Sequence, residues 1–449
     1  MIRASIALIS CLVVMVAAPA HAQSLIRDAE IEAMLYDYGD PLFRAAGLRS
    51  EDIGIYIVAD NSMNAFVTRG QNVFLNTGII LEADTPNQLQ GVMAHETGHI
   101  SGGHLLRMGE AQSQAMTTMF LTMGVGLLAV LAGAPDAGAA VMASSQQFAA
   151  LNFMTHTRVQ ESNADQAAIE FMETAGISPE GIVGFFERFR HEEVLAERQQ
   201  SPYFRTHPLS SARIAALRKK ISESDFRDYR DSPEEIARLQ LVQGKIYGFL
   251  ETPQRVFRVY KRDDDSMPAR YARAVALYRS GALDKAVEEV DSLIQSDPDY
   301  PYFHELKGQM YFESGKADLA IEPYRKSVEL EPDQPLLEVG LAQSLIRHGE
   351  DDEIEEAIGL LKKSLRAEHD NSYAWYQLSL AYNAQGKTSL AQLAVAEQSF
   401  ASGDLRRAAM FAHRAKEGLE TGTLDWRRAS DILSVSEPML RAAAEQRRR

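Results

Sequence analysis

Cysteine is nearly absent from this 449-residue sequence, in which Cys11 is the single example. One thiol cannot form an internal disulfide, so a zinc site would have to use histidine and carboxylate ligands. Positive charge is also scarce, because 46 Lys and Arg stand against 62 Asp and Glu, a formal net charge of -16. Nucleic-acid binding requires a basic surface, so we expect no nucleic-acid partner.

The first residues resemble a secretory signal peptide. Arg3 precedes an apolar run from Ile6 to Ala17, and Ala20-His21-Ala22 has the small-x-small pattern of a cleavage site. The apolar run is too short to span a membrane comfortably. We therefore expect residues 1–22 to be removed, together with Cys11, and the mature chain to be exported to the periplasm.

The remaining chain is too long for one hydrophobic core and divides into three segments. Residues 23–225 mix helical patterns with short strand patterns, of which Ile53–Val58 is an example. Residues 226–267 are charged and less regular, which is typical of a connector. Residues 268–449 are helical and repetitive. The expected fold is an α+β domain, mostly helical with a small sheet, followed by an all-α domain.

The C-terminal segment repeats with a fixed period. Gly281, Gly315 and Gly349 are spaced 34 residues apart, and Ala286 and Ala320 follow the first two glycines by five residues. A period of 34 with glycine and alanine at these offsets is typical of tetratricopeptide repeats. Residues 268–449 are therefore expected to form a helical solenoid, whose concave surface binds peptides or partner proteins.

A metal-binding pattern lies on a well-marked helix. Thr85 is a natural N-cap, and the run His95-Glu96-Thr97-Gly98-His99 follows within the same helix. Two histidines four residues apart project from one helical face and can share a metal ion. Glu96 stands beside the first of them, where its carboxylate can take a proton from a water at the metal.

A catalytic zinc needs a third protein ligand and one open position. His104 lies five residues after His99, which rotates it off the ligand face, so it is rejected as a ligand. Glu161 is the better candidate, on a second expected helix. Asp165, one turn further on, would accept the outer N–H of a ligand histidine and fix its tautomer.

The pattern His95-Glu-x-x-His99 followed by Glu161-x-x-x-Asp165 resembles the HtpX/CAAX-endopeptidase family of gluzincin metallopeptidases. With the export signal and the C-terminal repeats, the resemblance is to the periplasmic members of that family. It implies a zincin-like peptidase domain that holds one Zn²⁺ per chain through His95, His99 and Glu161. It also implies that Glu96 is the catalytic base for endoproteolysis of peptide bonds.

The resemblance also implies partners. The clients would be misfolded or stalled outer-membrane proteins and their assembly machinery, which the repeats would dock. Asn64-Ala65-Phe66 matches the family's edge strand, which holds substrate by β-augmentation. A second hypothesis is a chaperone-like assembly adaptor in which proteolysis is minor or latent. A purely structural zinc site conflicts with the position of Glu96.

His207-Pro208 matches a similar His-Pro stretch near the end of peptidase domains in this family. Three roles for His207 stay open. It could occupy the open position on the zinc as a further ligand and silence the enzyme. It could instead donate to the oxyanion in the transition state. The third reading is that it caps the helix that follows.

A long uncharged stretch separates the two ligand-bearing patterns. Ala111 to Pro135 contains no charged residue, and after Asp136 the sequence is uncharged again to Thr157. Its length could span a bilayer, but Gly124 and Gly126 weaken that reading. We expect residues 111–157 to form a helical hairpin that covers the active-site cleft or contacts membranes or hydrophobic clients.

Overall fold

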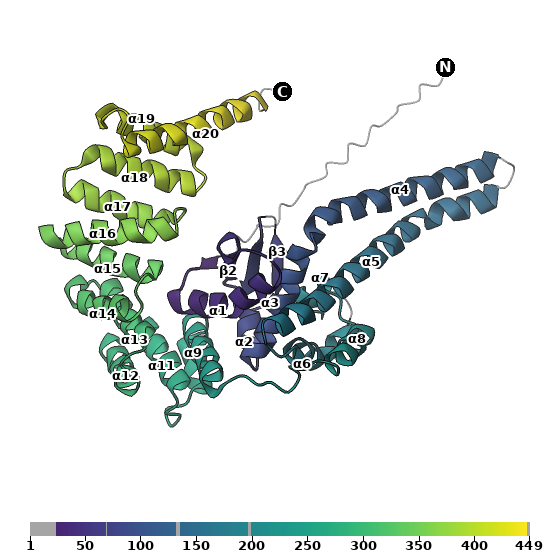
Figure 1. Cartoon of the computed structure of the whole chain (residues 1–449), viewed down its shortest axis with the longest axis horizontal. Helices are drawn as coiled ribbons and strands as arrows, with labels where there is room; N and C mark the ends of the chain where they lie inside the picture. The colour runs from purple at the N-terminus through teal and green to yellow at the C-terminus, as the bar shows by residue number, and fades with distance from the viewer. Residues whose placement is uncertain (1–23, 69, 132–134, 196–198, 447–449) are drawn as a thin grey trace, which may run out of the picture.

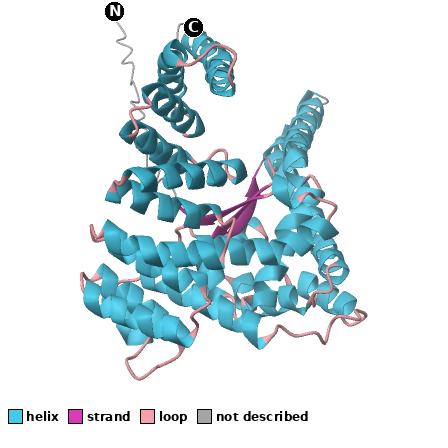
Figure 2. Ribbon diagram, turned by 60° about the vertical axis from the view of Figure 1, so that its left-hand side comes forward, coloured by secondary structure: helices cyan, strands magenta, loops and turns pink. Residues whose placement is uncertain are grey.

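The computed structural model describes residues 24–68, 70–131, 135–195 and 199–446. The predicted signal peptide, residues 1–22, lies outside these described residues. The described chain has an N-terminal half built around a small sheet and a C-terminal half of stacked helices (Figure 1). In the turned view the strands lie among the helices, beside the curved helical stack (Figure 2).

The sheet has four strands in the order β1-β2-β4-β3. Their bounds are β1 Leu25–Ile26, β2 Gly54–Val58, β3 Ala65–Thr68 and β4 Asn72–Asn76. β2 and β4 pair in parallel, whereas β3 pairs antiparallel with β4. The strand pattern seen at Ile53–Val58 in the sequence is confirmed by β2. β3 forms one edge of the sheet, as expected for the strand that begins near Asn64.

Helix α3 (Pro86–Ser101) lies at the centre of the N-terminal half and carries the histidine pattern. Its N-cap is Thr85, whose hydroxyl accepts a hydrogen bond from the Gln88 N–H, as predicted. It packs on α1 (Ala29–Ala45), α5 (Pro135–Thr174) and α6 (Glu180–Arg188). At Gly98 a Cβ would lie 2.9 Å from the Ala164 carbonyl oxygen, so glycine lets α3 approach α5 closely.

Six further α-helices and two 3₁₀ helices complete the described part of this half. They are α2 Thr77–Glu82, α4 His104–Leu131, α5 Pro135–Thr174, α6 Glu180–Arg188, α7 Pro202–Thr206 and α8 Ser211–Ile221, with the short 3₁₀ helix η1 Ser50–Asp52; a second 3₁₀ helix, η2, spans Arg190–Val194. Buried apolar side chains from α1, the sheet, α3, α6 and the end of α5 form one core.

α4 and α5 form the predicted hairpin, which projects from the body of the molecule (Figure 1). Phe120, Leu121 and Leu128 are exposed along α4. By length and composition, His104–Val130 is the one described helix long and apolar enough to cross a membrane. The outer part of the hairpin extends away from the sheet, while its base lies beside α3. Its role as a lid or as a contact for membranes or clients stays a prediction.

The C-terminal half is an array of antiparallel helix pairs. Its helices are α9 Pro233–Leu250, α10 Pro253–Val259, α11 Met267–Arg279, α12 Leu283–Ser296, α13 Pro301–Glu313, α14 Ala317–Leu330, α15 Pro335–His348, α16 Asp351–Ala367, α17 Ser372–Ala384, α18 Thr388–Ala401, α19 Leu405–Gly418 and α20 Leu424–Gln446. Gly281, Gly315 and Gly349 end helices with φ of 77°, 77° and 96°, a left-handed conformation that favours glycine. The expected helical solenoid is confirmed.

Residues 226–267 differ from the irregular connector that we expected, because α9 and α10 occupy most of them. Leu239, Val242 and Ile246 of α9 are buried in the core of the N-terminal half. Their spacing of three and four residues is that of an amphipathic helix, a signal that the nearby charged run obscured. α9 therefore belongs to the packing of both halves.

A buried charged cluster joins the two halves. Lys245 of α9 is 2% exposed. Its Nζ lies 2.7 Å from Asp28 Oδ2, 3.1 Å from Glu30 Oε2 and 3.5 Å from Glu305 Oε2. Burial lowers the pKa of Lys245, but the surrounding carboxylates outweigh it and raise that pKa well above its ordinary value. The start of α1 and the repeat helix α13 therefore share one buried cation.

Hydroxyl groups complete the cluster around Glu30, which is itself fully buried. Tyr271 and Tyr300 donate to its two carboxylate oxygens at 2.7 and 2.6 Å. Nearby, Arg27 donates to Glu368 of the repeats at 2.6 Å. Buried charges are stable only when they are paired and hydrogen-bonded. The stability of this cluster between the two halves therefore depends on all of its members.

Candidate metal centre

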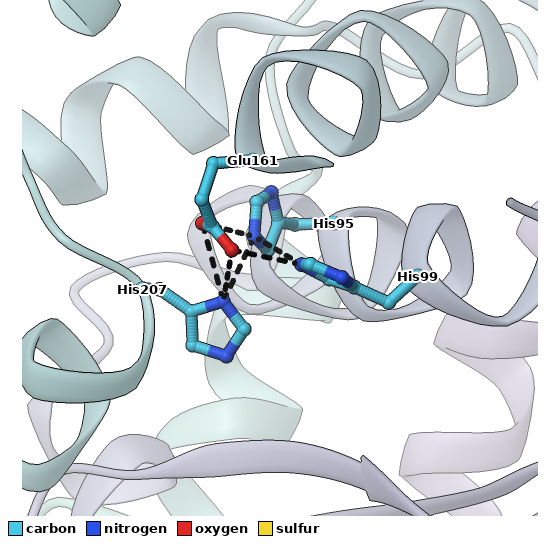
Figure 3. Close-up of side chains that lie close together, drawn as sticks. All are labelled: His95, His99, Glu161 and His207. Atoms are coloured by element: carbon cyan, nitrogen blue, oxygen red, sulfur yellow. Dashed lines mark hydrogen bonds and ion pairs between the residues drawn. The ribbon is translucent and has the colours of Figure 1, made fainter. Parts of the chain in front are cut away.

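Four side chains from three parts of the chain converge in the N-terminal half. His95 and His99 come from consecutive turns of α3, Glu161 comes from α5, and His207 follows α7. Figure 3 shows the four side chains pointing toward one another. One ligand atom from each lies within 4.8 Å of the others, and all four residues are buried. The structure thus brings together the two predicted histidines, the predicted carboxylate and His207.

The donor atoms face a common centre. His95 Nε2 lies 3.1 Å from His99 Nε2 and 3.3 Å from His207 Nδ1. The two oxygens of Glu161 lie 3.4 Å from the Nε2 atoms of His95 and His99, and 3.3 Å from His207 Nδ1.

This donor set fits a metal cation. Three imidazoles and a carboxylate crowded into one buried centre cannot all be satisfied by sharing protons, because each neutral ring carries only one N–H. A cation accepts lone pairs from all of them, and nitrogen and oxygen donors of this kind suit divalent metals such as zinc.

The surroundings of the ligands shift their pKa values in different directions. Burial lowers the pKa of His99 to about 2, so its ring is neutral and free to donate a lone pair. Burial alone would also lower the pKa of His95, but hydrogen bonds to Asp165 and Glu161 raise it to about 9. Burial raises the pKa of Glu161, and His207 and His95 outweigh it and hold that pKa well below its ordinary value.

Glu96 lies beside this group without belonging to it. Its side chain is fully buried, and its Oε1 is 3.5 Å from His207 Nε2. Within the described residues, neither of its carboxylate oxygens accepts a hydrogen bond. Burial raises the pKa of Glu96 above its ordinary value. A carboxylate with no hydrogen-bond donor and a raised pKa is suited to accept a proton from water.

Asp165 lies where the sequence predicted it. Its Oδ1 is 3.0 Å from His95 Nδ1, the ring nitrogen that faces away from the ligand group. A carboxylate there fixes the ring orientation and leaves Nε2 free for the metal. Burial raises the pKa of Asp165, but Arg213 and His95 outweigh it and lower that pKa below its ordinary value.

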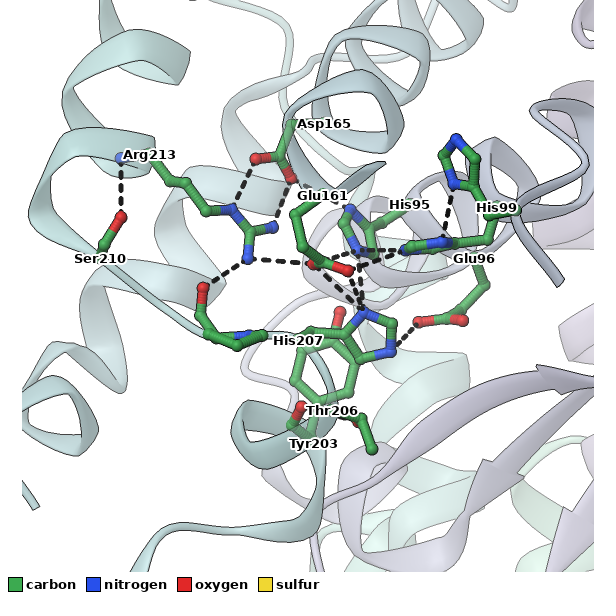
Figure 4. A network of polar contacts seen from close by, with 12 residues as sticks. His95, Glu96, His99, Glu161, Asp165, Tyr203, Thr206, His207, Ser210 and Arg213 are labelled. Atoms are coloured by element: carbon green, nitrogen blue, oxygen red, sulfur yellow. Dashed lines mark hydrogen bonds and ion pairs between the residues drawn. The ribbon is translucent and has the colours of Figure 1, made fainter. Parts of the chain in front are cut away.

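Two residues near the centre were not identified from the sequence. Arg213 of α8 donates to both oxygens of Asp165, at 2.8 and 2.7 Å (Figure 4). His104 was set aside as a ligand, and the structure instead places its Nδ1 2.9 Å from His99 Nδ1, on the far side of that ring. The sequence features that could have drawn attention to these residues are the short distance in the chain from His207 to Arg213 and the Gly-Gly turn before His104.

A cavity of about 190 Å³ opens beside the ligand group. Phe66 and Val67 of the edge strand β3 form part of its wall, together with Glu96 and His99. The base of the hairpin contributes His104 and Leu105 of α4 and His156, Thr157 and Gln160 of α5, and Glu161, Thr206 and His207 complete the lining. An extended segment beside β3 would therefore lie next to Glu96.

Comparison with known proteins agrees with this arrangement. Residues 26–221 match peptidase family M48, and residues 255–301 and 271–335 match the tetratricopeptide repeat. The chain is 25% identical to the beta-barrel assembly-enhancing protease of Yersinia pestis over 406 residues, which cover 89% of this chain and 82% of that protein. It is 28% identical to the putative beta-barrel assembly-enhancing protease of Vibrio cholerae, over 90% of this chain and 83% of that one.

Among solved structures, the crystal structure of MamA matches 38% of this chain and 96% of its own, at 22% identity and a TM-score of 0.29. The match to the peptidase family comes before the match to the tetratricopeptide repeat, just as the half with the sheet comes before the array of helix pairs. The matches to the two relatives cover 89% and 90% of this chain. The chain therefore has a peptidase domain that matches peptidase family M48, followed by tetratricopeptide repeats, and it is a metalloprotease.

Proposed function

We propose that this chain is a periplasmic zinc endopeptidase that cleaves misfolded or stalled outer-membrane proteins during their assembly. The observation that carries the proposal is the buried convergence of His95, His99 and Glu161 beside Glu96. The names of its full-length relatives support the choice of client. The apolar run before Ala22 supports export.

The chain's own residues divide the catalytic work. His95, His99 and Glu161 would hold the zinc, which when bound supplies Lewis acidity toward the scissile carbonyl and the attacking water. Glu96 accepts a proton from that water and passes it to the leaving amine. The free edge of β3 holds the substrate main chain by β-augmentation, next to Phe66 and Val67 in the cavity wall.

The geometry of His207 favours the inhibitory role among its three readings. Its Nδ1 lies within the ligand group, 3.3 Å from both His95 Nε2 and the Glu161 oxygens. Catalytic zinc sites keep one position open, whereas a fourth protein ligand closes the site. The capping reading is wrong, because the N-cap of α8 is Ser210, whose hydroxyl accepts from Arg213 N–H. The oxyanion role remains the rival reading.

His207→Ala is therefore expected to increase proteolysis by about tenfold, which corresponds to a resting enzyme in which roughly one molecule in ten has an open site. The measurement is the initial rate of cleavage of an unfolded protein at a fixed zinc concentration. His191→Ala, which changes an exposed histidine of the same half, is the control and should leave the rate unchanged. A lower rate for His207→Ala would instead assign His207 to oxyanion stabilisation.

Metal analysis combined with digestion tests the proposed function as a whole. We expect one zinc per folded chain, and cleavage of an unfolded outer-membrane β-barrel protein that stops on chelation and returns with added zinc. A folded β-barrel in detergent serves as the resistant control substrate. Folded enzyme that contains no zinc and digests nothing would contradict the proposal.

One feature of the repeats favours the assembly adaptor as a second function. Tyr373, Tyr376 and Leu380 of α17 are 48%, 45% and 38% exposed. At spacings of three and four residues they form one apolar stripe on the helix. Exposed aromatic side chains of this kind are enriched at protein interfaces. We propose that the repeats dock client or assembly-machinery proteins through this stripe, with or without cleavage.

A further inference from the structure

Arg213 makes an unusual set of contacts at the rim of the metal centre. Its guanidinium is nearly buried, with a side chain that is 11% exposed. It donates through Nε and Nη2 to both oxygens of Asp165, and Nη1 lies 3.1 Å from Glu161 Oε2. The same Nη1 donates to the Pro208 carbonyl oxygen at 2.8 Å. Figure 4 shows all of these contacts radiating from one planar group.

The two carboxylates that Arg213 contacts both act on the metal ligands. Glu161 is itself a member of the ligand group. Asp165 acts through His95, whose Nδ1 lies 3.0 Å away, and thereby directs His95 Nε2 toward the centre. Arg213 therefore holds Glu161 and Asp165 of α5 in place from α8.

The third contact reaches the segment that carries His207. The Pro208 carbonyl follows His207 directly in the chain, so a donor that holds this carbonyl also limits how far His207 can move. The guanidinium is held in turn by the Phe186 ring, whose centroid lies 5.1 Å from Arg213 Cζ. One side chain thus ties α5 to the His207 segment.

We propose that Arg213 is a positioning residue that sets the metal affinity of the centre and holds His207 within the ligand group. It contacts the ligands and their supports rather than the reacting atoms. The inference rests on the proposed function, in which this centre binds zinc. Lysine could not replace it, because a single ammonium group lacks the planar fork that serves two carboxylates and a carbonyl together.

Arg213→Lys tests the proposal, with Arg218→Lys as its matched control. Arg218 lies on the same helix and pairs with Glu187 and Glu180, but on the exposed surface away from the centre. The first measurement is zinc affinity by competition with a chromophoric chelator. The second is the visible absorption of the protein loaded with Co²⁺, compared with that of His207→Ala.

We expect Arg213→Lys to weaken zinc binding by about ten- to a hundredfold, the usual effect of removing a support for metal ligands. Its cobalt spectrum should shift from that of the unsubstituted chain toward that of His207→Ala. Arg218→Lys should match the unsubstituted chain in both measurements. If Arg213→Lys does not fold, as judged by circular dichroism, Arg213→Gln is measured in the same two ways.

An unchanged zinc affinity would overturn the proposal, and so would an unchanged cobalt spectrum, because each reports one of the two tasks assigned to Arg213. These readouts do not depend on proteolysis. If the unsubstituted chain bound zinc but cleaved nothing, the proposed function would fail while the affinities still decided the role of Arg213. If it bound no zinc, both proposals would be wrong.

Discussion

Glu96→Gln is expected to lower the rate of peptide cleavage by about 10²- to 10⁴-fold, the range that general-base catalysis contributes. Glutamine has nearly the same shape, but its amide cannot accept the proton of the attacking water. Glu96 lies outside the four-residue ligand group, so the zinc content should not change. The loss should therefore appear in the catalytic rate with folding and metal content intact.

The measurement is the cleavage rate of an unfolded protein alongside zinc content and thermal stability. Glu170→Gln, at an exposed glutamate of α5, is the control and should cleave normally. A Glu96→Gln enzyme with normal activity would remove Glu96 from the mechanism. The same variant separates protease from adaptor, because a cellular role that survives it depends on the repeats rather than on cleavage.

Lys245→Met is expected to lower the free energy of unfolding by about 3 to 5 kcal/mol, the usual result of removing one partner from a buried charged cluster. Methionine matches the length of lysine but leaves the carboxylates of Asp28, Glu30 and Glu305 without their shared cation. Because these carboxylates come from α1 and α13, the largest effect should be on the joint between the two halves.

Both tryptophans, Trp375 and Trp426, lie in the repeats, so their fluorescence reports the unfolding of that half alone. Far-ultraviolet circular dichroism reports both halves. We expect the two signals to change together in urea for the unsubstituted chain and to separate for Lys245→Met. Lys307→Met, which breaks a surface pair with Asp291, should cost less than about 1 kcal/mol and keep the signals together. Unchanged stability in Lys245→Met would show that the halves do not depend on this cluster.

The metal-binding helix could be predicted from the sequence because its signals are local. The N-cap at Thr85 and the four-residue spacing of His95 and His99 depend only on α-helical geometry, and both are found. Glu161 and Asp165 could be placed together for the same reason, since they lie one turn apart on α5. The two helices were placed together because a catalytic zinc needs a third protein ligand and because the sequence resembles a known family, not because of their spacing.

The contacts of Arg213 and Lys245 could not be predicted, because they depend on how distant helices pack. Arg213 reaches Asp165, 48 residues earlier, only because α8 crosses beside α5. Lys245 was hidden in a segment whose charge suggested a connector, and its partners lie in α1 and α13. A lone charged residue in a sequence is usually exposed, so nothing local marked either side chain as buried.

The start of α1 has a consequence for the order in which the chain is completed. Glu30 binds Tyr300, 270 residues later, and Arg27 binds Glu368, 341 residues later. A chain made from its N-terminus cannot form these contacts until most of the repeats exist, and such distant pairings form slowly. The contacts at the start of the first helix therefore form only after most of the chain has been made. A product truncated before the repeats would keep Lys245, but it would leave Glu30 without Tyr271 and Tyr300 and Arg27 without Glu368, and it would fold into a less stable enzyme.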